Sequence, residues 1–239
     1  MKTKIEWGAA VRALEGWREG LSGGAADNAD GGSNAAMPSV STVAERYRQD
    51  AWAVLVSTII SLRTKDAVTL VSSRKLLGKA PTPQKLLKLD EAETAALIYP
   101  AGFYKTKAAN LHKIAGILID KYGGEPPPDM DALLALPGVG RKTANLVLIE
   151  AYGMDGICVD THVHRISNRL GAVSTKTPEE TEFALRETLP QKYWKRINAL
   201  LVLYGQNVCK PVRPRCELCV ITRHCAFYKS ATGSTSVSR

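Results

Sequence analysis

Four cysteines lie close together near the end of the chain and follow the spacing C-x6-C-x2-C-x5-C. Thiolates are soft ligands for zinc ions and iron–sulfur clusters, and four of them in so short a segment can wrap one metal centre. Zinc sites tend to use two CxxC-type pairs, but only one such pair occurs here. The spacing therefore predicts a metal-binding loop and leaves the metal open. The predicted ligands are Cys209, Cys216, Cys219 and Cys225.

Two disulfides are the alternative for these four cysteines. The chain begins without the long apolar segment of a secretory signal, and disulfides are rare in the cytosol. No uninterrupted apolar run is long enough to span a membrane. We therefore expect a cytoplasmic protein with no membrane partner and with reduced cysteines. The fifth cysteine, Cys158, lies in the apolar run 157–159 and is expected to be a buried small side chain.

Positive charge is the main feature of the composition. The 239 residues carry a formal net charge of +9, and the pI is near 9.3. Such a chain usually binds something anionic, most often nucleic acid or a membrane surface. Lys210, Arg213 and Arg215 lie between the cysteines, where a metal-pinned loop would suit them to contact a phosphate backbone. A solvated run of charges is the alternative.

The apolar residues recur with helical spacing, and no regular period-two alternation occurs, so we predict an all-α fold. Residues 50–63 are apolar on nearly all sides, which suits a helix buried within a bundle. A long helix is expected at about 105–122, before two glycines. Residues 1–20 are predicted to form an amphipathic helix and residues 21–38 a flexible linker. The tail, 229–239, is predicted to be disordered.

Two further helix starts carry the residues of side-chain caps. Asp90, with Glu93 three positions later, resembles a reciprocal cap. Thr177, Pro178 and Glu180 combine a cap, a first-turn proline and a glutamate at the third position. Both segments are therefore predicted to open helices.

The sequence Leu136-Pro137-Gly138-Val139-Gly140 separates two helical patterns. Two glycines so close together allow a sharp turn and let backbone N–H groups approach a ligand. They precede a helix N-terminus, which has N–H donors without intrahelical acceptors and a partial positive charge. The backbone of Gly138, Val139 and Gly140 is therefore predicted to bind a phosphate group. A plain turn between helices is the alternative.

Lys142 falls in the first turn of the second helix, where the helix dipole disfavours a cation and so favours the neutral amine. Such an amine can attack a sugar carbon and form a Schiff base. The helix runs outward for roughly 15 Å, a turn at 153–156 reverses the chain, and residues 157–160 return. This path predicts that Asp160 lies near Lys142. Asp160 is also expected to cap the helix that follows, and an ordinary surface position is the alternative for Lys142.

Three motifs in this order resemble endonuclease III, a family of helix-hairpin-helix DNA glycosylases. They are LPGVGRKTAN (136–145), VDTHVHRISNR (159–169) and the four-cysteine loop. Weaker matches occur at SLRTKD (61–66) and GFYKTKAANL (102–111). The resemblance covers about residues 40–228, and because order and separations agree, the combination is far more specific than any one motif.

The resemblance implies two helical lobes that bind double-stranded DNA containing damaged bases or abasic sites. One would be a six-helix barrel at 44–154 that ends with the hairpin and its second helix. The other would join the N-terminal helix, within 1–43, to residues 155–228 and would carry a 4Fe-4S cluster on the four cysteines. The family resemblance also leads us to expect a monomer associated with the nucleoid.

The resemblance also implies the chemistry of a bifunctional DNA glycosylase/AP lyase of base excision repair. Lys142 would be the Schiff-base nucleophile and Asp160 the catalytic carboxylate. The expected substrates are oxidised or ring-saturated pyrimidines such as thymine glycol and dihydrouracil, and β-elimination would cut the strand on the 3′ side. The hairpin backbone would bind phosphate, and the cations of the cysteine loop would dock that loop on DNA.

Two positions depart from the family's pattern. Arg63 stands where the best-known members have a glutamine that fills the space left by the flipped base, and Phe103 stands in place of a leucine wedge. Arginine can stack as well as hydrogen-bond, so opposite-base preference and lesion range depend on these positions. Pairing of Arg63 with a carboxylate and a core position for Phe103 are the alternatives. His162 matches a family position near DNA and is a further candidate contact.

Two other functions are compatible with several of these features. A monofunctional adenine or mismatched-thymine glycosylase would have the same fold and cluster, but those enzymes generally lack the hairpin lysine. A non-catalytic DNA-binding module would need neither Lys142 nor Asp160. The presence of both residues favours the bifunctional enzyme.

Overall fold

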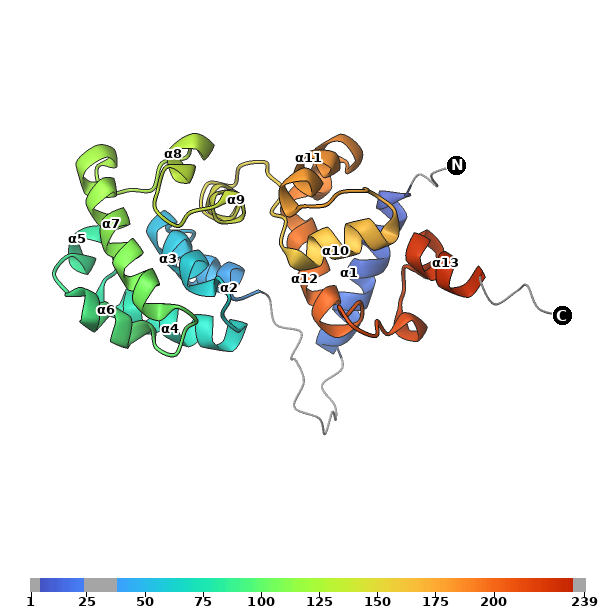
Figure 1. Cartoon of the computed structure of the whole chain (residues 1–239), viewed down its shortest axis with the longest axis horizontal. Coiled ribbons are helices and arrows are strands. Elements are labelled where there is room, and N and C mark those ends of the chain that lie inside the picture. Colours follow the sequence, from blue (N-terminus) through green and yellow to red (C-terminus); the bar gives the residue numbers. More distant parts are fainter. Residues whose placement is uncertain (1–4, 24–37, 234–239) are drawn as a thin grey trace. The chain divides into compact units, whose positions relative to one another are not determined.

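The computed structural model describes residues 5–23 and 38–233, which form helices joined by loops, with no strand among them. This confirms the predicted all-α fold. The described residues divide into two compact units (Figure 1). One unit, 38–156, contains α2–α9, and the other contains α1 and α10–α13. Residues 24–37, which make up most of the predicted linker, lie outside the described residues.

The unit formed by residues 38–156 contains eight helices, of which α5 and α8 have only four and five residues. The other six, each with at least 8 residues, equal in number the helices of the expected barrel. In chain order the eight helices are α2 (Ser39–Arg46), α3 (Ala51–Ser61), α4 (Asp66–Lys79), α5 (Pro83–Leu86), α6 (Glu91–Ile98), α7 (Tyr104–Tyr122), α8 (Met130–Leu134) and α9 (Arg141–Glu150).

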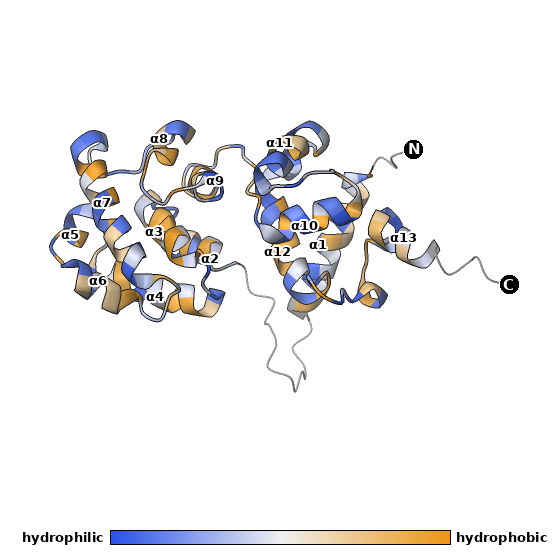
Figure 2. Cartoon of the chain, in the orientation of Figure 1, coloured by the Kyte–Doolittle hydropathy of each residue, from blue (hydrophilic) through white to orange (hydrophobic). Residues whose placement is uncertain are grey.

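Helix α3 forms the centre of this unit. Residues 51–60 of α3 are all buried, and α2, α4, α7 and α9 contact it. Figure 2 shows α3 as largely hydrophobic. Burying a large apolar side chain stabilises a fold by roughly 1.5–3 kcal/mol, so a helix apolar on all sides is stable only in such surroundings. The prediction of a buried helix at 50–63 is confirmed for Ala51–Ser61, while Leu62 and Arg63 lie beyond its end. Asp50 is its cap and accepts a bond from the backbone N–H of Ala53 at 2.7 Å.

Both predicted side-chain caps are present. Asp90 Oδ1 accepts a bond from Glu93 N at 2.6 Å, and Glu93 Oε2 accepts one from Asp90 N at 2.9 Å, which completes the reciprocal cap. Thr177 Oγ1 accepts a bond from Glu180 N at 3.1 Å. The Glu180 carboxylate accepts a bond from the N–H of Lys176, one residue before the cap. Local sequence therefore determines both helix starts.

The second unit has a core in which α1 and α10 pack against α12. From α1, Ala10, Val11 and Leu14 are buried, and the Trp17 ring meets Tyr204 edge to face at 4.8 Å between centroids. The helices are α1 (Trp7–Gly23), α10 (Thr161–Leu170), α11 (Pro178–Thr188), α12 (Trp194–Asn207) and α13 (Ala226–Gly233), with 3-10 turns at Gln191–Tyr193, Cys216–Leu218 and Thr222–His224.

The predicted disordered tail at 229–239 is wrong over its first residues, because 229–233 belong to α13. The reason is tertiary: α13 contacts α10, and the Arg169 guanidinium lies 5.0 Å from the centre of the Phe227 ring. The Ser- and Thr-rich composition of the segment gives no sign of this contact. Residues 234–239 lie outside the described residues. Among the residues that the structure describes, no helix is long and apolar enough to cross a membrane.

Glu150→Gln is expected to stabilise the fold at pH 8 and not at pH 4. Ser41 Oγ donates to Glu150 Oε1 at 2.6 Å, and a glutamine oxygen can accept the same bond. Burial, and then repulsion from Glu45, raise the pKa of Glu150 above its ordinary value of 4.5. The stability that a raised carboxyl pKa contributes is present below the ordinary pKa and is lost as pH rises through the raised one.

Thermal unfolding at the two pH values measures this effect, and an increase of up to about 3 °C is expected at the higher pH. Glu125→Gln, at an exposed position of the same unit, is the control. Equal shifts of Glu150→Gln at both pH values would show that the charge of Glu150 is not the cause.

Candidate active site

The hairpin between α8 and α9 depends on one glycine in a left-handed conformation. Gly138 has φ +77°, and a Cβ there would lie 2.6 Å from Asn110 Nδ2. Gly140 has φ −103° and open space around it, so its backbone conformation does not require glycine. Val139 is buried and its N–H donates to Leu136 O at 3.1 Å, which fixes the turn. Gly138 and Gly140 are exposed on either side of it.

Lys142 is the second residue of α9 and is partly exposed. The chain leaves α9 after Glu150 and turns back through Gly153, which has φ +62°. By Gly156 it has returned to α9: a Cβ on this buried glycine would lie 2.9 Å from Asn145 Oδ1 and 3.3 Å from Ile149 Cδ1. Asn145 is one helical turn from Lys142. The reversal that the sequence predicts is therefore present in the unit that contains Lys142.

Asp160 is the N-cap of α10, as predicted. Its Oδ1 accepts bonds from His162 N at 2.9 Å and Val163 N at 2.8 Å. Both bonds use the same oxygen, so the cap requires only one oxygen of the carboxylate. Asp160 is partly exposed, and the backbone before it is extended. The residue thus belongs to the unit with α10–α13 and places its carboxylate at a helix N-terminus, where negative charge is favoured.

The four clustered cysteines form no disulfide, and Cys158 is buried as expected. All four cysteines of the loop are partly exposed. Arg169 Nη1 donates to Cys209 Sγ at 3.3 Å, and the backbone N–H of Tyr228 donates to Cys225 Sγ at 3.4 Å. Burial, and then the neighbouring sulfurs, raise the pKa of the Cys216 and Cys225 thiols.

The four thiols are free, burial and neighbouring sulfurs raise the pKa of two of them, and two of the sulfurs accept hydrogen bonds from N–H groups. This arrangement suits a metal centre with thiolate ligands. The positive charge of such a centre would offset the repulsion among the sulfurs. Among the described residues, no three Cys, His, Asp or Glu side chains are grouped closely enough to hold a single metal ion.

Two arginines of α10 hold the cysteine loop, and none of the sequence motifs pointed to them. Arg165 Nη2 donates to Gly205 O at 3.3 Å and to Cys209 O at 2.8 Å. Arg169 donates to Lys210 O at 2.7 Å and to Pro211 O at 2.8 Å. The sequence does show that the two arginines are four residues apart, which places both on one face of a helix.

The three cations of the loop differ in exposure. Arg213 and Arg215 are exposed, and Lys210 is partly exposed. Arg213 has φ +51°, so the loop turns sharply at that residue. His162, the other candidate contact of this unit, is partly exposed and its Nδ1 lies 3.1 Å from Arg165 Nη2.

Arg63 and Phe103, far apart in sequence, face each other in the unit formed by 38–156. The Arg63 guanidinium lies 5.5 Å from the centre of the Phe103 ring. Both residues are exposed, and 62% of Phe103 is accessible, so the alternative that Phe103 belongs to the core is wrong. Arg63 is paired with this ring instead of a carboxylate. Both have positive φ, +51° and +56°, which is uncommon for residues other than glycine.

Lys107 is a third residue whose importance the sequence patterns did not reveal. It is only 6% exposed, and its Nζ donates three hydrogen bonds, to Ile60 O, Leu62 O and Thr64 Oγ1. Helical spacing gave a signal, since Lys107 shares a face of α7 with the buried Leu111.

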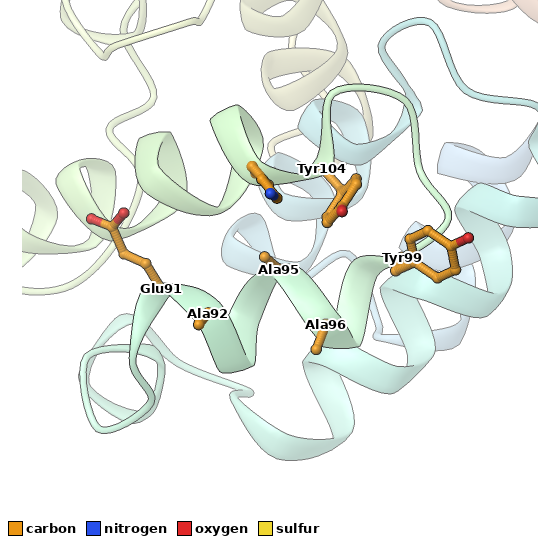
Figure 3. A pocket seen from close by; sticks show the side chains of 7 residues that line it. Glu91, Ala92, Ala95, Ala96, Tyr99 and Tyr104 are labelled. Carbon is orange, nitrogen blue, oxygen red and sulfur yellow. The ribbon is translucent and has the colours of Figure 1, made fainter.

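A cavity of about 520 Å³ lies beside α6 and α7 (Figure 3). The rings of Tyr99 and Tyr104 meet there edge to face at 5.4 Å. None of the predicted catalytic residues lines it, so this cavity is separate from the candidate site. Its lining residues are Glu91, Ala92, Ala95, Ala96, Tyr99, Tyr104 and Lys105.

Comparisons with known proteins agree with this geometry. The HhH-GPD superfamily of base excision DNA repair proteins matches residues 56–191. Endonuclease III of Thermotoga maritima is 48% identical over 180 residues, which cover 75% of this chain and 84% of that protein. The chain belongs to the endonuclease III family.

Longer relatives in this family match over part of their length. Endonuclease III homolog 1, chloroplastic, of Arabidopsis thaliana is 45% identical over 199 residues, 79% of this chain and 52% of that protein. Endonuclease III-like protein 1 of Bos taurus is 44% identical over 186 residues, 77% of this chain and 59% of that protein. The chain thus spans little more than half of these two relatives.

Solved structures confirm the predicted helix-hairpin-helix glycosylase fold. A trapped endonuclease III–DNA covalent intermediate matches with a TM-score of 0.72 and 32% identity, over 81% of this chain and 95% of that chain. A thermostable thymine-DNA glycosylase matches with a TM-score of 0.69 and 23% identity, over 93% of this chain and 99% of that chain, and so shares the fold. Family membership makes this chain a base excision repair enzyme of the glycosylase and AP lyase type.

Gly138→Ala is expected to destabilise this endonuclease III relative by about 1–3 kcal/mol, because alanine would have to adopt positive φ with its Cβ against Asn110. Gly140→Ala, where the backbone is extended and nothing lies near, should cost less than about 1 kcal/mol. Thermal unfolding measures both variants. If the two glycines proved equally sensitive, a left-handed Gly138 would not explain the hairpin.

Proposed function

We propose that this chain acts as a monomer that removes oxidised pyrimidines from double-stranded DNA and then cuts the strand 3′ to the resulting abasic site. Lys142 is the nucleophile and Asp160 the catalytic carboxylate. The main support is the return of the chain along α9: Gly156 packs beside Asn145, one turn from Lys142, and Asp160 follows four residues later. The chain is thus directed back along α9 at the point where it leaves the unit that carries the amine.

The reaction begins when the damaged base leaves the stack, which costs least for a base that is already poorly stacked or paired. The amine of Lys142 attacks C1′, and the bond between C1′ and the base breaks as the base departs with the bonding electrons and takes up a proton. Asp160 accepts a proton from the Lys142 ammonium or stabilises the positive charge that develops on the sugar. Opening of the sugar ring then gives a protonated Schiff base.

Strand cleavage follows from this Schiff base. The positive nitrogen acidifies the C2′ proton, and when this proton is removed, the electrons form a double bond to C3′. The bond between C3′ and its phosphate oxygen breaks, so the strand ends on the 3′ side of the lesion. Water then hydrolyses the Schiff base and releases Lys142.

The DNA contacts of this proposal come from both units. The exposed backbone at Gly138 and Gly140 precedes the N-terminus of α9, which suits a phosphate group. Lys210, Arg213 and Arg215 dock the cysteine loop on the DNA backbone, and His162 contacts DNA next to Asp160. Arg63 and Phe103 occupy the space that the displaced base leaves.

The thiolates of Cys209, Cys216, Cys219 and Cys225 would hold a 4Fe-4S cluster, which would supply a rigid centre for the folded loop. The N–H groups that donate to Cys209 and Cys225 suit thiolate ligands, because such bonds stabilise the charged sulfur. Arg169 connects this centre to α10 and therefore to the helix that Asp160 caps.

Borohydride trapping on a duplex containing thymine glycol is expected to give a covalent protein–DNA product with the wild type and none with Lys142→Ala. Removal of the amine eliminates the only proposed nucleophile. Lys121→Ala, which removes an exposed lysine of α7, is the matched control and should trap normally. If the wild type gave no product on this duplex or on one with an abasic site, the lyase function would be excluded, leaving a monofunctional glycosylase or a DNA-binding protein.

Asp160→Asn is expected to separate capping from catalysis. The amide oxygen can still accept from His162 N and Val163 N, so the melting temperature should change by less than about 2 °C. The single-turnover rate of base release should fall by about 100-fold or more, because the charge is lost. Asp160→Ala, which removes the cap as well, should lower both the melting temperature and the rate of base release. A normal rate for Asp160→Asn would rule out the carboxylate as a catalytic group.

A further inference from the structure

Lys107 lies near the start of α7 with its side chain buried inside the unit formed by 38–156. Its Nζ donates to Ile60 O at 2.7 Å, to Leu62 O at 2.6 Å and to Thr64 Oγ1 at 3.0 Å. Burial lowers the pKa of Lys107 to about 8, so the ammonium form predominates at neutral pH. An ammonium group has three N–H donors, and each of them has an acceptor here.

The acceptors lie where α3 ends and the next turn begins. Carbonyl groups at a helix C-terminus lack intrahelical partners and carry partial negative charge. The ammonium of Lys107 satisfies two carbonyls at this end, those of Ile60 and Leu62. A single cation therefore connects the start of α7 to the end of α3 and to the turn that follows.

That continuation leads at once to Arg63, and α7 is itself preceded by Phe103. The two residues face each other at 5.5 Å, and both are held in the left-handed conformation that non-glycine residues rarely adopt. Such a conformation persists only when its surroundings enforce it. Lys107 donates hydrogen bonds to the two residues that flank Arg63 in the sequence, Leu62 and Thr64.

A second hydrogen bond joins the two loops. The hydroxyl of Thr64, which accepts from Lys107 Nζ, also accepts from the backbone N–H of Gly102 at 3.1 Å. The loops approach so closely that a Cβ on Gly102 would lie 2.5 Å from Arg63 O. The Thr64 hydroxyl thus accepts bonds from both Lys107 and Gly102. It links the turn that carries Arg63 to the turn that carries Phe103, and both to the same lysine.

We propose that Lys107 is a positioning residue for lesion recognition, which holds Arg63 and Phe103 as a stacked pair ready to enter the space left by a displaced base. The inference rests on the proposed function, because it assigns the pair to base displacement. Lys107 itself is buried and touches no substrate. Its effect is therefore specific to the step in which the base leaves the stack, and absent from the chemistry at Lys142.

The test compares single-turnover rates on two duplexes, one with thymine glycol and one with a preformed abasic site, from which no base has to be displaced. Lys107→Met is expected to lower the thymine glycol rate by about tenfold or more, and the abasic-site rate by less than about threefold. Lys113→Met, which replaces an exposed lysine of the same helix, should leave both rates unchanged. A role that is merely structural would lower the two rates in the same proportion.

The two substitutions Thr64→Val and Thr64→Ser provide the same test if Lys107→Met does not fold. Valine removes the hydroxyl shared by Lys107 and Gly102 and should lower the ratio of the thymine glycol rate to the abasic-site rate. Serine keeps the hydroxyl and should leave this ratio unchanged. A ratio unchanged in Lys107→Met, or in Thr64→Val when only that variant folds, overturns the proposal. If the wild type itself acts on neither duplex, the proposed function fails, which is a different result from an unchanged ratio.

Discussion

The cap that Asp160 provides to α10 is the interaction on which the second unit depends most. It begins the helix that carries Arg165 and Arg169, and these two arginines bind the carbonyl groups of the cysteine loop. One ten-residue helix therefore connects the proposed catalytic carboxylate to the proposed cluster ligands. Because the cap needs only one oxygen of the carboxylate, structural and chemical roles are compatible in a single side chain. The position of the cysteine loop and that of Asp160 are consequently determined together.

Much of this architecture was predictable from the sequence, wherever the determining interactions are local. The caps at Asp90 and Thr177 join residues three positions apart, and the hydrophobic surface of α3 is visible as an unbroken apolar segment. The turn at Gly138 follows from the conformational freedom of glycine. The return of the chain beside α9 was also predictable, since helix rise and extended-chain length set how far back a short segment can reach. The family's motifs led to the roles proposed for Lys142 and Asp160, which residue types alone left open.

What the sequence did not reveal depends on contacts between distant segments. Lys107 binds acceptors 43 to 47 positions earlier, and Arg169 binds the cysteine loop about 40 positions later. A buried lysine on an apolar helix face can be noticed, but its acceptors emerge only when α3 and α7 are packed together. The same holds for Arg63 and Phe103, which local rules place in two unrelated loops. The tail at 229–233 was misjudged because a composition rich in serine and threonine conceals a contact with α10.

The distribution of cysteines over the two units bears on the state of the protein while it is being synthesised. Residues 38–156 contain no cysteine, so none of the ligands proposed for the cluster lies in this unit. Helix α1 is made earlier, yet its packing partner α12 is among the last helices to be synthesised. During translation α1 therefore remains without this partner until the intervening unit has been synthesised. Loss of the proposed cluster would then act directly on one unit, while the other has no cluster ligand to lose.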